Sequence, residues 1–182
     1  MTHKLEPLEP PFQEDIAEIL EKYPQSDGYI LSLFRVFANS KRFLLDKGVV
    51  NLLDKKSPIS LREREIVILR VCANNNCEYE WGVHASVFAT AAQLNEEQVA
   101  ATKLGEATEA CWGTQDQLLI QAIDELCELS KIQDSTYAEF QKHWNLEQQL
   151  EILALCGNYH TISFVANSAR LENEIFGAKF PE

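Results

Sequence analysis

The chain has few residues that interrupt secondary structure. It contains seven glycines and six prolines in 182 residues, and three of the prolines lie within the first eleven positions. Glycine and proline punctuate turns, so an interior that is poor in both favours long helices over many short strands. No stretch alternates apolar and polar residues with the period of two that is typical of a strand. The sequence therefore predicts an all-α fold.

Basic residues are also scarce. Sixteen lysines and arginines stand against 28 acidic residues, which gives a formal net charge of −12. A protein that binds nucleic acid usually carries a basic patch, so we expect no nucleic-acid partner. The sequence begins without the apolar core of a secretory signal and has no run of about 18 apolar residues. We therefore expect a cytoplasmic protein with no membrane partner.

The cysteines do not form a recognisable framework. There are five, an odd number, scattered through helical patterns, and no Cys-x-x-Cys pair occurs. This arrangement is typical of a reducing compartment and does not predict a thioredoxin-type dithiol. No metal or cofactor is expected either. Glu80 and His84 supply only two ligands, and the His-Glu-x-x-His pattern of zinc enzymes is absent.

Apolar residues recur at helical spacing along most of the chain. Ser60 and Glu63 have the spacing of a capping box, which predicts the start of the main helix. A triple asparagine, Asn74 to Asn76, predicts its end. Further helices are expected over residues 12–22, 29–45, 77–93, 95–104, 114–129, 135–143 and 146–175, with a shorter segment over 49–53.

Three reactive side chains follow the asparagines at helical spacing. Cys77, Glu80 and His84 are three and four residues apart, so they fall on one face of a helix. The asparagine turn can bring Glu65 of the preceding helix back against that face. A thiol, two carboxyl groups and an imidazole would then form one local site for proton transfer.

Each of these residues also has an ordinary structural interpretation. A helix N-terminus favours a thiolate at Cys77, but free cysteine is among the most buried residue types. A buried Glu80 would have a raised pKa and act as a general acid, whereas an exposed one would only pair with His84. His84 suits a proton shuttle near neutral pH. Glu65 is either part of this site or a charge in the first helical turn.

Three other residues are candidates for substrate binding. Tyr159 and His160 form a polar island in an otherwise apolar helix. A histidine in such a place is either a hydrogen-bonded core residue or part of a pocket. Trp81 lies among the reactive residues of the first site. We therefore predict a substrate pocket lined by Trp81, Tyr159 and His160.

Two segments of the chain resemble a known family. Residues 60–70, SLREREIVILR, and residues 77–84, CEYEWGVH, are similar to the carboxymuconolactone decarboxylase family, which includes alkylhydroperoxidase D. The resemblance extends over about residues 30–172 and implies an all-helical domain that assembles as trimers or hexamers, with active sites near subunit interfaces. We therefore expect an N-terminal extension with a short helix over 1–28, the family domain over 29–176 and a tail over 177–182.

The resemblance also implies roles for individual residues. In the alkylhydroperoxidase branch a relay glutamate precedes a Cys-x-x-Cys pair, and a histidine follows four residues later. Glu65 matches the glutamate, Cys77 the first cysteine and His84 the histidine, while Glu80 stands in place of the second cysteine. The dithiol cycle of that branch cannot run on positions 77 and 80. The decarboxylase branch needs no cysteine pair and uses acid and base groups.

Three functions follow from these observations. The first is a homo-oligomeric enzyme of lyase or decarboxylase type that acts on a small carboxylated or carbonyl substrate. In it His84 is the base or shuttle, Glu80 the general acid, Glu65 the orienting relay and Cys77 a pocket thiol. The alternatives are an antioxidant hydroperoxide reductase with one reactive cysteine, and a non-catalytic helical oligomer that binds a ligand. For a carboxylated substrate, the candidate cations are Arg62, Arg64 and Arg70.

Overall fold

The computed structural model describes residues 6–26, 28–39, 44–45 and 57–182, and these contain eight helices and one two-stranded sheet. The first part holds α1 (Glu14–Leu20), the antiparallel pair β1 (Gln25–Ser26) and β2 (Tyr29–Ile30), and α2 (Ser32–Phe37). The main body consists of α4 (Leu61–Asn74), α5 (Glu78–Phe88), α6 (Glu96–Leu104), α7 (Thr114–Leu129), α8 (Asp134–His143) and α9 (Leu146–Ser168). The all-α prediction is confirmed. The segment expected over 49–53 lies outside the described residues.

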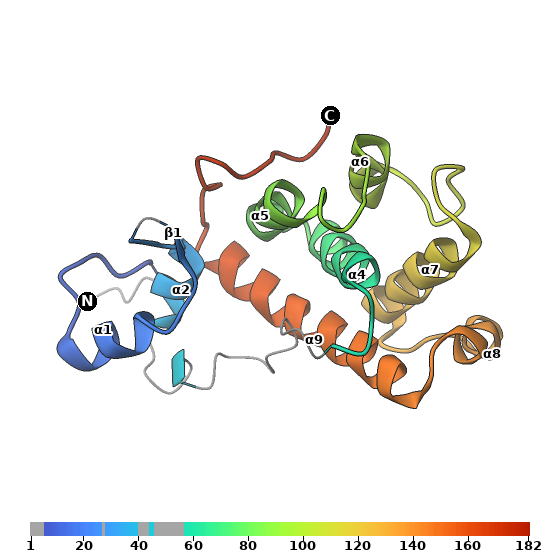
Figure 1. Cartoon of the computed structure of the whole chain (residues 1–182), viewed down its shortest axis with the longest axis horizontal. Helices are drawn as coiled ribbons and strands as arrows, with labels where there is room; N and C mark the ends of the chain where they lie inside the picture. The colour runs from blue at the N-terminus through green and yellow to red at the C-terminus, as the bar shows by residue number, and fades with distance from the viewer. Residues whose placement is uncertain (1–5, 27, 40–43, 46–56) are drawn as a thin grey trace.

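Helix α4 is the centre of the main body. Figure 1 shows it between α5 and α6 on one side and the long α9 on the other, with α7 alongside. Every residue from Glu65 to Ala73 of this helix is buried. A helix that is apolar around most of its circumference is stable only inside a core, and here its neighbours cover it on all sides. Its start is fixed by the predicted capping box, since the Glu63 amide donates to Ser60 Oγ at 3.2 Å.

The turn between α4 and α5 positions the candidate site. Asn76 has a left-handed backbone with φ of 50°, a conformation that asparagine tolerates better than most residues. Its amide donates to the Ala73 carbonyl at 3.0 Å, and the Cys77 amide donates to the Cys72 carbonyl at 2.8 Å. These two bonds are the Schellman motif that ends many helices. They reverse the chain, so α5 packs back against α4.

Several expected helices have different bounds in the structure. The helix predicted over 77–93 ends at Phe88. The helix predicted over 29–45 begins only at Ser32, because Tyr29 and Ile30 pair with β1 around Gly28, whose φ is 80°. The last helix ends at Ser168 and not at residue 175. There Arg170 takes a left-handed backbone with φ of 53°, and its neighbour Leu171 donates its amide to the Ala166 carbonyl at 3.1 Å.

The C-terminal segment lies along α5, above it in Figure 1. The Ala178 amide donates to the Gly82 carbonyl at 3.1 Å, and the Phe180 amide donates to Glu78 at 2.7 Å. A β-carbon at position 82 would lie 2.2 Å from the Ala178 carbonyl oxygen, so this close approach requires glycine. Residues 177–182, expected as a tail, thus cover one side of the helix that carries the candidate site.

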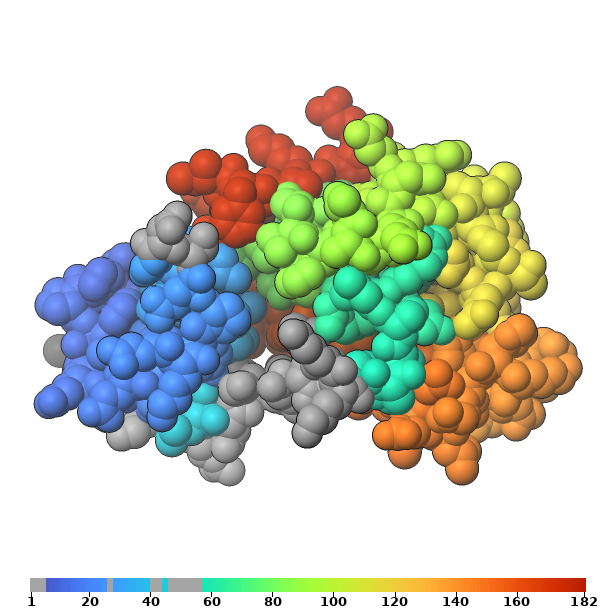
Figure 2. All heavy atoms as spheres, viewed as in Figure 1, coloured from blue at the N-terminus to red at the C-terminus, as the bar shows by residue number. Residues whose placement is uncertain are grey.

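The N-terminal segment forms the opposite end of the molecule from α7 and α8, as the space-filling view in Figure 2 shows. Its contact with the main body runs through Tyr79 of α5. The Tyr79 hydroxyl accepts the Leu33 amide at 3.2 Å and donates to Glu174, so it joins α2, α5 and the segment that follows α9. Among the described helices, none combines the length and the apolar character that a membrane span requires.

Candidate active site

His84 lies at the point where three helices meet. Its Nδ1 atom is 2.7 Å from Glu65 Oε2 on α4, and its Nε2 atom is 2.9 Å from the Tyr159 hydroxyl on α9. All three side chains are buried, with at most 4% of each residue exposed. The structure therefore brings Glu65 and His84 together, as the sequence indicated, and adds Tyr159 as a direct partner of the imidazole.

Glu80 is the fourth member of this cluster. It lies one turn before His84 on α5, and its Oε1 atom is 3.5 Å from His84 Nε2. Its other carboxyl oxygen, Oε2, is buried and has no hydrogen-bond partner. Buried polar atoms are nearly always paired, because an unpaired one costs about 1–3 kcal/mol. An unpaired carboxyl oxygen beside an imidazole is therefore available to a bound molecule.

The charges of the cluster are set by its two carboxyl groups. Burial alone would lower the pKa of His84, but the hydrogen bonds to Glu65 and Glu80 and their negative charges outweigh it and raise the pKa to about 9. Burial raises the pKa of Tyr159 well above its ordinary value, and the charge of Glu80 adds to this effect. At neutral pH the cluster thus contains an imidazolium and a neutral phenol.

Cys77 is the N-cap residue of α5, but it is not the thiolate that this position suggests. Its side chain is fully buried, and burial raises its pKa. The Glu80 amide at the helix start acts in the opposite direction, and the negative charge of the Glu80 side chain raises the pKa further. Desolvation therefore outweighs the helix dipole here, which corrects the expectation from position alone.

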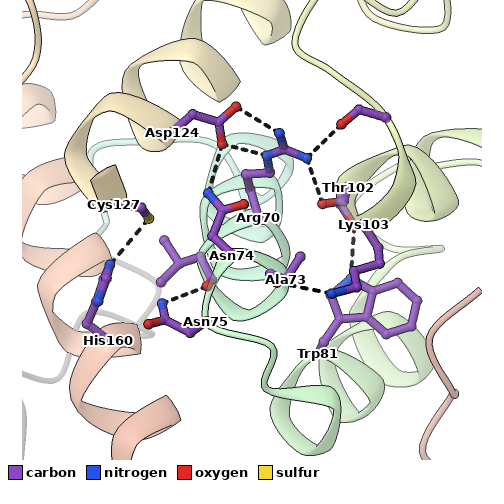
Figure 3. A network of polar contacts seen from close by, with 12 residues as sticks. Arg70, Ala73, Asn74, Asn75, Trp81, Thr102, Lys103, Asp124, Cys127 and His160 are labelled. Atoms are coloured by element: carbon purple, nitrogen blue, oxygen red, sulfur yellow. Dashed lines mark hydrogen bonds and ion pairs between the residues drawn. The ribbon is translucent and has the colours of Figure 1, made fainter. Parts of the chain in front are cut away.

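Trp81 and His160 belong to a different polar network, shown in Figure 3. The Trp81 indole donates to Thr102 Oγ1 at 2.9 Å and packs against Phe180. The His160 ring contacts the Cys127 thiol on α7 at 3.3 Å, and burial lowers its pKa. Of the three predicted pocket residues, the structure places only Tyr159 in contact with the reactive cluster.

The three arginines that were candidates for a substrate carboxylate differ in their surroundings. Arg62 is paired with Asp116 at 2.8 Å. Arg70 is buried and paired with Asp124 at 2.6 Å, within the network of Figure 3. Arg64 Nε is 3.0 Å from Glu65 Oε1, so Arg64 is the arginine that reaches the cluster.

Two further buried residues belong to the site. Cys72, on α4, is fully buried, and burial raises its pKa well above the ordinary value. Ser163, one turn after Tyr159 on α9, is also fully buried, and its hydroxyl oxygen has no hydrogen-bond partner. Both belong to helices other than α5. Cys72 is five residues before Cys77 in the sequence, whereas the spacing around Cys77 could not indicate Ser163.

The cluster of Glu65, Glu80, His84 and Tyr159 does not line the surface groove of the structure. A surface groove of about 690 Å³ lies between the N-terminal segment and residues 169–176, where Tyr29 and Glu174 line it, and none of the cluster residues is part of it. Two partly exposed residues lie on one side of His84. The Phe88 ring is 5.1 Å from the imidazole, and the Arg64 guanidinium is 5.8 Å from the Phe88 ring. Within the described ranges no three histidine, cysteine or acidic side chains are grouped to hold a metal ion.

Solved structures with the same architecture define the class of fold. A peroxidase-related protein from Silicibacter sp. TM1040 superposes with a TM-score of 0.78 at 15% identity, over 100% of both chains. A peroxidase-related protein with an alkylhydroperoxidase AhpD core, from Ralstonia eutropha JMP134, gives 0.75 at 14% identity, over 96% of this chain and 95% of that one. The debrominase Bmp8 in complex with 2,3,4-tribromopyrrole gives 0.73 at 13% identity, over 97% and 94%. The fold is thus of the alkylhydroperoxidase D type.

The sequence of the central helices is similar to one protein family. Residues 44–122 match the carboxymuconolactone decarboxylase family, and this segment contains Glu65, Cys77, Glu80 and His84. The resemblance predicted from the sequence is confirmed over these residues, which make up the central part of the chain. No curated protein sequence matches the chain.

Proposed function

We propose that this chain is an enzyme that moves protons on a small carbonyl or carboxylated substrate, in lyase- or decarboxylase-type chemistry. The observation that supports this most is the pairing of His84 with Glu80, whose second carboxyl oxygen is buried and unpaired. A general base needs a free lone pair within hydrogen-bond reach of the substrate, and a general acid needs a proton to give. Glu80 meets the first need and the His84 imidazolium the second. These roles are the reverse of those expected from the sequence, because the two carboxyl groups raise the pKa of His84.

In this proposal the other members of the cluster hold the pair in place. Glu65 accepts the Nδ1 proton of His84 and keeps the ring oriented with Nε2 toward Glu80 and Tyr159. Glu80 takes a proton from the substrate, and His84 returns one from Nε2 to the developing anion. The neutral Tyr159 hydroxyl then donates to the deprotonated Nε2. A closed, dry site strengthens each of these interactions.

Substrate binding is assigned to the side of the cluster that faces Arg64 and Phe88. The guanidinium of Arg64 can hold a carboxylate by charge-assisted hydrogen bonds, and it already lies 3.0 Å from Glu65. The ring of Phe88 contacts His84 and supplies an apolar wall. Because the cluster is buried, Arg64 and Phe88 must move aside for a substrate to enter.

We also propose that the enzyme is a homo-oligomer. Leu146, Leu150 and Phe164 of α9 are 76%, 68% and 61% exposed, whereas Ile152, Leu155 and Tyr159 on the other side of the helix are buried. Exposed apolar side chains on one helix are typical of a surface that packs against a partner. Light scattering should give a mass above 20.7 kDa, and Leu150→Glu should lower it.

The five cysteines of the described residues are unpaired, which supports a reducing, cytoplasmic location.

The catalytic proposal can be tested before the substrate is identified. A panel of small oxo acids and lactone acids is incubated with the enzyme in heavy water, and loss of substrate C–H signals is followed by proton NMR. Proton abstraction predicts deuterium uptake into one compound class with wild-type enzyme and loss of that uptake with His84→Asn. Circular dichroism of the variant controls for folding. Equal uptake by the wild type and the variant would remove His84 from the mechanism.

A second candidate function is hydroperoxide reduction by Cys77. It is supported by the place of Cys77 at the start of α5, one turn before Glu80, whose carboxylate could take the proton of the thiol; burial raises the pKa of that thiol. Dilute hydrogen peroxide should then give a sulfenic acid at Cys77 that dimedone traps. Absence of the adduct from folded wild-type protein would exclude this function. If neither test gives a positive result, the chain is a non-catalytic ligand-binding protein.

A further inference from the structure

Two cysteines flank the turn between α4 and α5. In the Schellman motif that ends α4, Cys72 is the third residue from the helix end and Cys77 is the second residue beyond the cap. The side chains at these two positions commonly contact each other in this motif. Here both are thiols, and both are fully buried.

The backbone hydrogen bond of the motif limits the distance between these residues. The Cys77 nitrogen is 2.8 Å from the Cys72 carbonyl oxygen. With standard bond lengths and angles, that contact holds the two α-carbons within about 6.7 Å of each other. Disulfides join α-carbons that are about 4.4–6.8 Å apart. The separation of the two α-carbons is therefore within the range that a disulfide spans.

The same neighbouring groups change the pKa of both Cys72 and Cys77. The negative charge of a Cys77 thiolate contributes to the raised pKa of Cys72, next to the effect of burial, so the two sulfurs share one environment. The hydroxyl of Ser163 on α9 lowers the pKa of both thiols, against the effect of burial. Glu80, one turn along α5, contributes its charge to both thiols as well.

We propose that Cys72 and Cys77 form a redox-active dithiol that a hydroperoxide converts to a disulfide. The pair would supply the second thiol that the chain lacks at position 80. This inference deepens the second candidate function and rests on it for the identity of the attacking thiol.

The oxidation takes place in two balanced steps. Glu80 takes the proton of Cys77, and the sulfur attacks the peroxide, so an S–O bond forms, the O–O bond breaks and the alcohol leaves with that proton. The Cys72 sulfur then attacks the Cys77 sulfenic acid, so the S–S bond forms, the S–O bond breaks and water leaves with the Cys72 proton. Two thiols lose two electrons, and the hydroperoxide gains them.

The sequence allows a direct test by peptide mass. Trypsin releases residues 71–103 as one peptide, and Cys72 and Cys77 are its only cysteines. Folded protein is treated with hydrogen peroxide or tert-butyl hydroperoxide, unfolded in N-ethylmaleimide and digested. The proposal predicts a peptide that carries no maleimide and is lighter than the reduced peptide by two hydrogens. Dithiothreitol should restore two alkylation sites.

Two variants separate the steps. In Cys72→Ser, Cys77 should stop at the sulfenic acid and give a dimedone adduct at least several times stronger than in the wild type. The matched control is Cys156→Ser, which removes another buried thiol and should leave disulfide formation in the 71–103 peptide unchanged.

The outcomes distinguish this inference from the function on which it rests. A wild-type sulfenic acid at Cys77 with Cys72 still open to alkylation would overturn the dithiol and leave the second candidate function standing. No oxidation of Cys77 in folded wild-type protein would remove both. Because these readings come from the wild type, they do not depend on how well a variant folds.

Discussion

Replacing Glu65 by glutamine should lower the pKa of His84 and so change the charge of the site. Glu65 accepts the Nδ1 proton of the imidazole at 2.7 Å, and its hydrogen bond is the strongest influence that raises this pKa against burial. Glutamine keeps the size and one oxygen acceptor but removes the negative charge. With burial less opposed, the imidazole should lose its proton at a lower pH than in the wild type.

The contribution of His84 to the free energy of folding follows from its pKa of about 9 in the folded chain and the ordinary value of 6.5. At about 1.36 kcal/mol for each pKa unit, the protonated form gains roughly 3 kcal/mol from folding. Since the folded pKa is raised, this contribution to stability is present below pH 6.5 and is lost as the pH rises through 9. Glu65→Gln should lower the pKa of His84 by at least about 1 unit and flatten this pH dependence.

The assay is an NMR titration of the histidine ring carbons between about pH 5 and pH 10, assigned with His84→Asn. His160 serves as the internal control, because its ring contacts Cys127 and not Glu65. Urea unfolding at both ends of the range measures the stability. A wild-type His84 that titrates at or below 6.5, or a pKa that Glu65→Gln leaves unchanged, would refute the electrostatic account of the site.

Further predictions concern the fold around the site. Gly82→Ala should detach the C-terminal segment, because its β-carbon would lie 2.2 Å from the Ala178 carbonyl oxygen; faster amide hydrogen exchange at Ala178 would show it. Gly157→Ala is the matched control, since nothing lies within 4 Å of that position, and it should raise the free energy of unfolding by about 0.5–1 kcal/mol. Equal stability of the two variants would contradict the first expectation. Arg70→Leu removes the partner of Asp124, and urea unfolding should show a loss of about 2 kcal/mol or more; a loss below about 0.5 kcal/mol would contradict this view of the ion pair.

Local signals along the chain predicted the part of the site that lies on neighbouring residues. The capping box at Ser60 and the triple asparagine indicated the helix start and the turn, and spacing placed Glu80 beside His84. The turn also explains why Glu65 of α4 contacts the face of α5 that carries His84. These features depend on residues close in the chain, where helix geometry alone decides what can meet.

Contacts between distant elements could not be predicted in the same way. Tyr159 and His160 are adjacent in the sequence, but only the rotation of α9 against α5 decides which of them reaches His84. The pKa of Cys77 depends on how completely the surrounding chain buries it, and its position at a helix start suggested the opposite direction. The short pair of strands formed because Gly28 allows a tight turn that the helical periodicity of that region concealed.

The central claim is that Glu80 and His84 do the chemistry and that Cys77 is not required for it. Its most direct test is the rate of deuterium uptake into the substrate for Glu80→Gln and Cys77→Ser, measured side by side with folded protein. The account predicts that Glu80→Gln loses at least about 100-fold in rate, the usual contribution of a general acid or base, while Cys77→Ser stays within a few fold of the wild type. Loss of activity in Cys77→Ser with activity kept in Glu80→Gln would contradict it.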